Sequence, residues 1–212
     1  MSDFNGMSIE RKGEDYAVTR VTREAVIGVT LGRGEYRVPK LDTTILFFDH
    51  MLEMLGWYSD LNIDASYEAK TYRLMHVVCE DIGLALGHAA RALVVDGITT
   101  GIESRGNGFG LMDEARAEAA VSFEGRSNAF LTIDDAARLE RVEDMLTIDL
   151  AAFFEGFSQG ARATVHLRLA DGVDPHHAWE AGFRAFGHAL RSALLLNPRR
   201  AGMTAGVKGT LD

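Results

Sequence analysis

The sequence predicts an α+β fold of two similar halves, each a mostly antiparallel sheet with two helices on one face. Two observations support this prediction. The helix-like segment HVVCEDIGLALGHAARAL, which starts at His76, is matched by HHAWEAGFRAFGHALRSAL, which starts at His176. The alternating, strand-like segment NIDASYEA is matched by ATVHLRLA. We expect residues 1–103 to form the first half and residues 104–212 the second, with their helix layers packed together between the two sheets.

Each half also contains an earlier helix and earlier strands. The segments HMLEMLGWYSDLNIDASY and AFFEGFSQGARATVHLRL both read as a helix, a turn and a strand. Upstream of these, AVIGVTLGRGEYRV and AAVSFEGRSNAFL are strand-like. Each half is therefore predicted to run strands, helix, strand, helix. The start of a half is the least decided part, because helix and strand patterns compete in DEARAEAAVSF.

Composition and charge exclude several classes of protein. Of the 212 residues, 47% are hydrophobic and 25% are charged, which is an ordinary globular balance. The formal net charge of −9 argues against nonspecific nucleic-acid binding. Cys79 is the one cysteine, so the chain can form no internal disulfide. The first residues do not resemble a signal peptide, and no apolar run has the length of a membrane span. We therefore expect a cytoplasmic protein without membrane or nucleic-acid partners.

The hexapeptide PHHAWE, residues 175–180, combines imidazole and carboxylate groups. Residues i and i+4 share one face of a helix, so His176 and Glu180 can hold one metal ion together. Such a pair can also be no more than a polar helix start, but it recurs as His76 and Glu80, 100 residues earlier (176 − 76 and 180 − 80). That recurrence favours metal binding. The mixture of nitrogen and oxygen ligands suits manganese, iron or zinc.

Two further histidines are candidates. His177 is rotated about 100° from His176 by the helical period, so we expect it to point toward a different ion. His50 follows two aromatic residues in FFDHML, where a lone histidine is more often a hydrogen-bonded core residue. Its counterpart in the second half is Ala152, at an offset of 102 (152 − 50), so the repeat itself gives His50 no support.

With these residues in place, the chain resembles the imidazoleglycerol-phosphate dehydratase family, from about Thr22 to Leu211. The resemblance rests on the order and spacing of FFDHML, EDIGLALG, MDEA, EGR, HHAWEAGFRAF, NPRRAG and KGTL. It implies a carbon–oxygen lyase of histidine biosynthesis, which removes water from imidazoleglycerol phosphate to give imidazole acetol phosphate. It also implies residence in the cytoplasm, or in plastids in plants.

The resemblance further implies a cofactor and an assembly. Two manganese ions per active site are expected, at contacts between subunits that form trimers and then a larger homo-oligomer. The imidazole of the substrate would bridge the ions as an anion, which helps it to expel the neighbouring hydroxyl group. A carboxylate would remove the proton from the next carbon.

The resemblance assigns roles residue by residue. Glu24, in RVTREAV, matches the acid–base glutamate, and the alternative for it is an ordinary charge on a strand. Glu80 and Glu180 are also expected to take part in catalysis. The residues that match phosphate-binding positions are Arg105, Arg126 and Lys208. The residues that match metal ligands are His50, His76, Glu80, His176, His177 and Glu180.

The chain departs from the family's pattern at several of these places. Val77 and Ala152 stand where two further ligands are expected. If His50 completes the set of His176 and Glu180, and His177 that of the first-half pair, each site has three protein ligands instead of four. Before Lys208, two positions that usually carry small hydroxyl residues are Gly206 and Val207.

Three functions are open at this point. The chain is an active dehydratase, or a diverged paralogue that uses the same metals on another phosphorylated or heteroaromatic substrate, or a noncatalytic metal-binding assembly protein. The retained ligands and Glu24 favour the first function, and the changes at Val77 and Ala152 favour the second. Glu24 counts against the third, because a scaffold has no need of an acid–base group.

Overall fold

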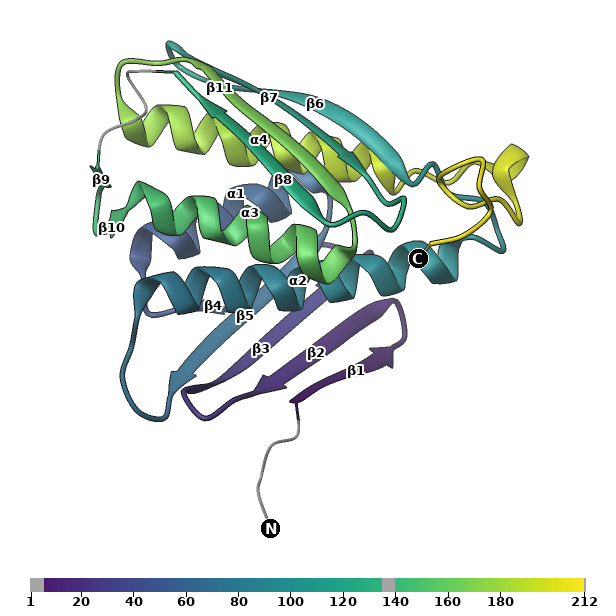
Figure 1. Ribbon diagram of the computed structural model, residues 1–212, viewed down its shortest axis with the longest axis horizontal. Coiled ribbons are helices and arrows are strands. Elements are labelled where there is room, and N and C mark those ends of the chain that lie inside the picture. Colours follow the sequence, from purple (N-terminus) through teal and green to yellow (C-terminus); the bar gives the residue numbers. More distant parts are fainter. Residues whose placement is uncertain (1–5, 135–139, 212) are drawn as a thin grey trace.

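The computed structural model describes residues 6–134 and 140–211 of the chain. Two sheets enclose four helices, which lie between them (Figure 1). This arrangement confirms the predicted α+β class and the position of the helix layers. The division that we predicted after residue 103 falls in the connection between the second helix and the second sheet.

The first sheet has the strand order β1-β2-β3-β5-β4. Its neighbours are antiparallel, except that β4 runs parallel to β5. In β3, side chains alternate between the buried inner face and the outer face, as a strand covered on one side requires. The strands are β1 (Gly6–Lys12), β2 (Asp15–Val21), β3 (Ala25–Gly32), β4 (Leu41–Asp42) and β5 (Asn62–Ala69).

The second sheet repeats this arrangement without a counterpart of β1. Its order is β6-β7-β11-β8, with antiparallel neighbours except for the parallel pair β11 and β8. A separate hairpin of two short strands, β9 and β10, precedes the third helix. The strands are β6 (Arg105–Met112), β7 (Ala115–Ser122), β8 (Asn128–Ile133), β9 (Arg141–Val142), β10 (Met145–Leu146) and β11 (Thr164–Asp171).

The segment in which helix and strand patterns competed is strand β7. Its alanines favour a helix when considered alone. In the structure Ala115, Ala117 and Ala119 are buried, while the residues between them are partly or fully exposed. Pairing with β6 and β11 on its two sides decides the conformation, so tertiary context overrides local preference here.

The helices are α1 (Leu46–Ser59), α2 (Met75–Gly97), α3 (Thr147–Ala161) and α4 (Pro175–Ala193), followed by the short 3-10 helix η2 (Pro198–Arg200). Helix α2 packs against α3, and α1 packs against α4. Helix α2 covers β2 and β3, whereas α4 covers β6 and β7. Both α1 and α3 end at a residue with left-handed backbone, Asp60 (φ 56°) and Arg162 (φ 48°), and lead into β5 and β11. The predicted helix, turn and strand in each half are therefore confirmed.

The contact between α2 and α3 brings the two backbones together. A Cβ atom added to Gly156 of α3 would lie 2.2 Å from the carbonyl oxygen of Glu80 on α2. A Cβ added to Gly83 of α2 would lie 2.2 Å from the carbonyl oxygen of Phe153 on α3. Each helix therefore needs glycine where the other crosses it, because real Cβ atoms do not come so close to backbone oxygens.

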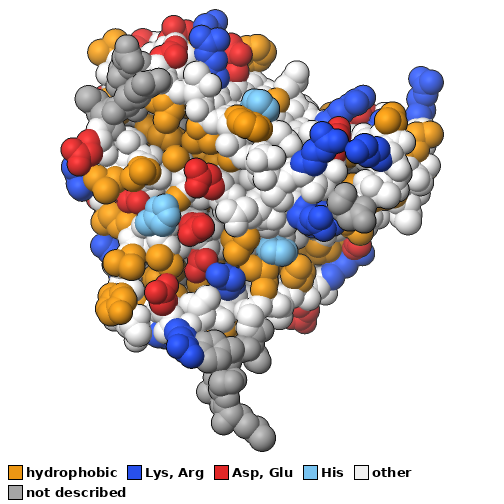
Figure 2. Space-filling model, viewed as in Figure 1, with side chains coloured by type: hydrophobic (Ala, Val, Ile, Leu, Met, Phe, Trp, Pro, Cys, Tyr) orange, Lys and Arg blue, Asp and Glu red, His pale blue; other side chains and the backbone are white. Residues whose placement is uncertain are grey.

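Charge is distributed unevenly over the surface. On the face shown in Figure 2, Lys and Arg side chains gather at the end where η2 and the last residues lie, although the chain as a whole is acidic. Such a local excess of positive charge favours an anionic ligand there. Within the described residues, no helix is both long and apolar enough to cross a membrane.

We predict that Gly156→Ala destabilises the fold although alanine favours helices. The gain in helix propensity is about 1 kcal/mol, whereas forcing a methyl group into a closed contact costs about 1–3 kcal/mol and here meets backbone that cannot rotate away. Thermal unfolding should show a midpoint lowered by a few degrees. Gly34→Ala is the control, because its added Cβ would meet nothing closer than 3.8 Å. Equal midpoints for the two variants would contradict this account of the crossing.

Candidate active site

The first turn of α4 holds both adjacent histidines. Asp174 caps this helix by accepting a hydrogen bond from the backbone N–H of His176 (2.9 Å), and Pro175 occupies the first helical position. The rings of His176 and His177 are nearly perpendicular, with an interplanar angle of 81°. The two rings contact different carboxylates, Glu143 and Glu114.

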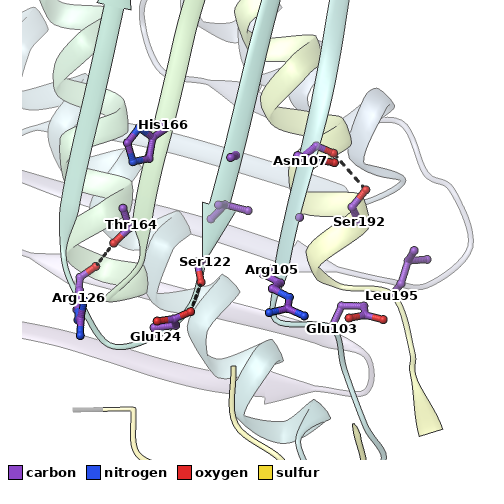
Figure 3. A pocket seen from close by; sticks show the side chains of 13 residues that line it. Glu103, Arg105, Asn107, Ser122, Glu124, Arg126, Thr164, His166, Ser192 and Leu195 are labelled. Atoms are coloured by element: carbon purple, nitrogen blue, oxygen red, sulfur yellow. Dashed lines mark hydrogen bonds between the residues drawn. The ribbon is translucent and has the colours of Figure 1, made fainter. Parts of the chain in front are cut away.

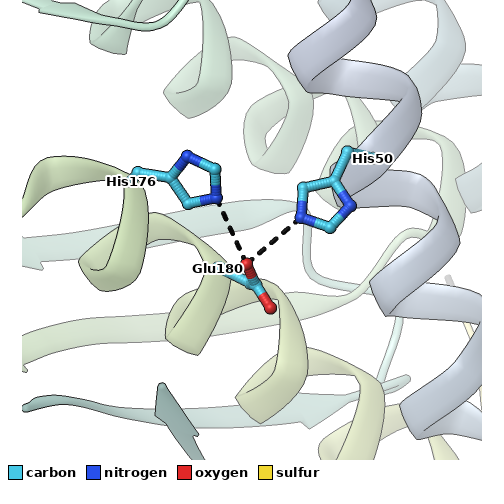
Figure 4. Close-up of side chains that lie close together, drawn as sticks. All are labelled: His50, His176 and Glu180. Carbon is cyan, nitrogen blue, oxygen red and sulfur yellow. Dashed lines mark hydrogen bonds and ion pairs between the residues drawn. The ribbon is translucent and has the colours of Figure 1, made fainter. Parts of the chain in front are cut away.

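His50, His176 and Glu180 converge at one point, which we call the trio (Figure 4). His50 comes from α1, and the other two come from successive turns of α4. Oε2 of Glu180 lies 3.1 Å from Nε2 of His50 and 3.4 Å from Nε2 of His176. Two ligands bound about 2.1 Å from one ion at tetrahedral or right angles are roughly 3.0–3.4 Å apart. The spacing and the donor atoms therefore fit one divalent metal ion.

The carboxylate of Glu180 is held from both sides. Its side chain is only 4% exposed. Burial alone would raise the pKa of Glu180, but the hydrogen bonds from Arg184 and His50 outweigh it and lower the pKa. Arg184 donates to Oε1 of Glu180 and to the backbone oxygen of Leu111. One oxygen of Glu180 is thus engaged by Arg184, which leaves Oε2 directed at the two histidines.

Each of the adjacent histidines also contacts a carboxylate through its Nδ1 atom. Nδ1 of His176 lies 2.9 Å from Oε1 of Glu143, and Nδ1 of His177 lies 2.8 Å from Oε2 of Glu114. Both contacts leave Nε2 as the nitrogen that can bind a metal. The hydrogen bond with Glu114 raises the pKa of His177 above its ordinary value.

The corresponding pair in the first half is more open. Nε2 of His76 lies 3.9 Å from Oε2 of Glu80, and both side chains are about half exposed. Nδ1 of His76 also lies 3.6 Å from Oδ1 of the buried Asp149 on α3. His177 does not join this pair within one chain. Across residues 6–134 and 140–211, only the trio satisfies the spacing required of three metal ligands.

The two positions where further ligands were expected differ in exposure. Val77 is partly buried on α2, beside His76. Ala152 is buried on α3, one turn before Gly156. The backbone of Gly156 packs closely against the backbone of Glu80 on α2. The second half thus places a methyl group where the first half places the imidazole of His50.

Glu24 lies in the turn that precedes β3, so it is not part of a strand. Its side chain is exposed, and its backbone oxygen accepts a hydrogen bond from the backbone N–H of Lys70 (2.7 Å). The negative charge of this carboxylate contributes to the pKa of Asp81, a buried residue of α2. Burial raises the pKa of Asp81, and the charges of Glu80 and Glu24 add to this, while Arg20 opposes it. The charges of Glu24 and Glu80 therefore both act on Asp81.

Arg105 and Arg126 line one cleft of about 740 Å³ at an end of the second sheet (Figure 3). Arg105 begins β6, and Arg126 lies in the connection from β7 to β8. Lys208 is exposed in the last turn of the chain and does not line this cleft. It lies two residues from Gly206, where an added Cβ would be 3.6 Å from Glu124, a lining residue. The C-terminal segment therefore reaches the rim of the cleft.

The cleft and the trio lie at opposite ends of α4. Ser192, near the end of this helix, lines the cleft, whereas His176 is in its first turn. The sixteen residue steps from His176 to Ser192 (192 − 176) span about 24 Å at the helical rise of ~1.5 Å. The residues expected to bind phosphate and those of the trio are therefore not brought together within one chain.

Four residues around the histidines were not identified from the sequence. Arg184 could have been found, because it follows Glu180 by four residues on the same helical face. Glu114 lies in the MDEA motif, but nothing in the sequence connects it with His177. Asp149 and Glu143 also gave no signal, because their contacts with the histidines arise only from the packing of distant segments.

We predict that Glu114→Gln lowers the pKa of His177. The carboxylate stabilises the protonated imidazole, so its removal should let His177 lose its proton at a lower pH. The backbone N–H of Asp174 and the His177 ring hold the pKa of Glu114 itself at about 2, so it is ionised throughout the titration. An NMR titration of the ring nitrogens tests this. Glu118→Gln, on β7, is the control, and a His177 curve that is the same in both variants would contradict the assignment.

Comparisons with known proteins identify relatives along nearly all of this chain. The family model described as imidazoleglycerol-phosphate dehydratase matches residues 43–190. An imidazoleglycerol-phosphate dehydratase of Ralstonia pickettii (strain 12J) is 34% identical over 195 residues, covering 92% of this chain and 97% of the relative. One of Koribacter versatilis (strain Ellin345) is 37% identical over 195 residues, covering 91% and 96%.

The fold is similar as well. A crystal structure of IGPD from Pyrococcus furiosus in complex with (S)-C348 superimposes with a TM-score of 0.72 and 29% identity. The match covers 90% of this chain and 98% of that one. With a family model over most of its length and relatives above 30% identity along nearly all of it, this chain belongs to the imidazoleglycerol-phosphate dehydratase family.

Proposed function

We propose that this chain is a hydro-lyase of histidine biosynthesis, which removes water from imidazoleglycerol phosphate and gives imidazole acetol phosphate. The observation that carries the proposal is the convergence of the trio in a chain of this family. Two imidazoles and one carboxylate suit a divalent transition metal and leave positions open for a substrate ligand. The proposed compartment is the cytoplasm, in keeping with a free, buried Cys79.

The proposed ions are manganese, two per active site. One is assigned to the trio, whose three ligand atoms lie within 4.8 Å of one another. The other is assigned to His76 and Glu80, with His177 supplied by another copy of the chain. Support for this division comes from the open position of the first-half pair and from Glu114, which leaves Nε2 of His177 available.

The chemistry that such ions supply is Lewis-acid stabilisation of negative charge on the imidazole ring of the substrate. The hydroxyl group on the carbon attached to the ring must leave as water, and a protein group must remove the proton from the carbon after it. We assign this step to Glu24, an exposed carboxylate whose charge, like that of Glu80, acts on Asp81. Glu80 and Glu180 contribute to catalysis through the ions that they hold.

Phosphate binding is assigned to Arg105 and Arg126 in the cleft and to Lys208 at its rim. Guanidinium and ammonium groups suit a phosphate dianion. A three-carbon phosphate ester of imidazole cannot span the distance between this cleft and the trio of the same chain. The proposed active site therefore combines residues of neighbouring copies, in trimers that assemble into a larger homo-oligomer.

A second candidate function is a diverged paralogue that acts on another phosphorylated or heteroaromatic substrate. The residues that favour it are Val77 and Ala152 at expected ligand positions and Val207 before Lys208. Turnover of imidazoleglycerol phosphate with added Mn²⁺ distinguishes the two functions. Metal-loaded protein that leaves this substrate unchanged would support the paralogue.

We expect the purified protein to bind at least one Mn²⁺ per chain. His50→Ala combined with His176→Ala should remove the ion of the trio, and adding His76→Ala should remove the second ion, because each substitution deletes a ligand. Metal analysis after dialysis measures both effects. His166→Ala, on the outer face of β11, is the control and should retain its metal. Undiminished metal in the triple variant would contradict the assignment.

We expect Glu24→Gln to reduce turnover of imidazoleglycerol phosphate by ~10²–10⁴-fold, the usual contribution of a positioned acid–base group. The glutamine has the same shape, and Glu24 lies on the surface, so metal content and thermal stability should be those of the natural chain. Glu10→Gln, on the exposed strand β1, is the matched control. Near-normal turnover of the Glu24 variant would mean that its carboxylate is only a surface charge.

A further inference from the structure

The hairpin of β9 and β10 presents two acidic residues at its tip. Its strands pair Met145 with Val142, and both of these side chains are buried in the core. The turn consists of Glu143 and Asp144, which are exposed. Glu143 has a φ of 48°, in the left-handed region that favours glycine. The favoured two-residue hairpin turns require such a backbone at their first central residue.

Asp144 fixes the start of α1. The N-cap residue of this helix, Ile45, provides no capping side chain. Instead, Oδ2 and Oδ1 of Asp144 accept hydrogen bonds from the backbone N–H groups of Leu46 (3.0 Å) and Phe47 (3.2 Å). A carboxylate at this end of a helix satisfies free N–H groups and interacts favourably with the helix dipole. His50 lies one turn further along the helix that Asp144 holds.

Glu143 fixes the ring of His176. Its Oε1 lies 2.9 Å from Nδ1 of His176, while Nε2 of the same ring lies 3.4 Å from Oε2 of Glu180. A proton on Nδ1 that is donated to Glu143 leaves the lone pair of Nε2 free, which is the state required for metal binding. The contact therefore sets both the orientation of the ring and its tautomer.

A third contact connects the two positions. Phe47, whose backbone N–H is bound by Asp144, is buried next to both histidines. Its ring centroid lies 5.0 Å from that of His176 and 6.5 Å from that of His50. The turn thus contacts both helices: Asp144 caps α1, and Glu143 forms a hydrogen bond with the His176 ring on α4. The side chain of Phe47 packs between the rings of His50 and His176.

We infer that Glu143 and Asp144 are positioning residues for the trio, and that this hairpin turn holds α1 and α4 in the relation that lets His50 and His176 meet at Glu180. The inference rests on the proposed function in so far as the trio binds a metal. The contacts that position the two rings, however, are made by protein groups alone. They can therefore be tested separately from metal binding.

The first test measures Co²⁺ affinity by calorimetry and Co²⁺ coordination by visible absorption. Glu143→Ala should weaken binding by about 10–100-fold, the usual effect of removing such an outer partner of a ligand, and should change the absorption spectrum. Glu143→Gln should recover part of the affinity, because its amide oxygen still accepts from Nδ1. Asp144→Ala should weaken binding, and Asp144→Asn should restore it because asparagine also caps helices well. Glu53→Ala, an exposed glutamate on α1, is the control.

The second test needs no metal. In protein labelled with ¹⁵N-histidine, the ring of His176 should carry its proton on Nδ1, and in Glu143→Ala the proton should move to Nε2. His176→Gln identifies the signal, and circular dichroism verifies folding. Natural protein that binds no Co²⁺ but shows the Nδ1 proton would remove the metal assignment and support the role of the hairpin. A proton on Nε2 in the natural chain, or wild-type affinity and spectrum in Glu143→Ala, would overturn the inference.

Discussion

The close crossing of α2 and α3 is the contact on which the rest of the structure depends. At Gly83 and Gly87 of α2, and at Gly156 and Gly160 of α3, an added Cβ would lie between 2.0 and 2.3 Å from a carbonyl oxygen of the other helix. The glycines let the two helix layers meet backbone to backbone, so the two halves share one core, in which Phe153 of α3 packs against Phe48 of α1 and Phe183 of α4. The separation of the sheets is thereby fixed, and so are the helix ends that carry the candidate ligands.

The same crossing accounts for the difference between the two halves. Where α1 meets α4, Gly187 contacts Tyr58, and polar side chains have room to meet, so that His50 reaches Glu180. Ala152 takes the place of His50 in the second half, one turn before the glycine that touches the backbone of Glu80. A methyl group suits a crossing in which the helices already touch. The repeat therefore supplies three converging ligands where α1 meets α4, but not at the corresponding contact between α3 and α2.

Much of the fold and of the ligand set was predictable from the sequence, because residues four apart on a helix lie on the same face. Spacing of four residues identified the His and Glu pairs, and the repeat identified the two halves with their helices between the sheets. The sequence did not reveal the hairpin of β9 and β10, because strands of two residues have no periodicity to detect. Its contacts could not be predicted for the same reason. Glu143 and Asp144 act on groups that are 33 and about 100 residues away in the chain, and only the packed structure brings them together.

The distance between the trio and the cleft lined by Arg105 and Arg126 determines whether one chain can form the active site alone. Along one α4 helix they are about 24 Å apart, so a single small substrate that uses both must lie between two copies of the chain. Binding of the metal and of the substrate would then stabilise the contact between these copies, because a ligand that bridges two chains favours the assembled state. An acidic chain with Lys and Arg side chains gathered near η2 on the face in Figure 2 fits such an arrangement, since a basic surface of one copy can lie against an acidic surface of another. With no further ligand from Val77 or Ala152, each ion would contribute less to that contact, and the proposed assembly would depend more on the protein surfaces themselves.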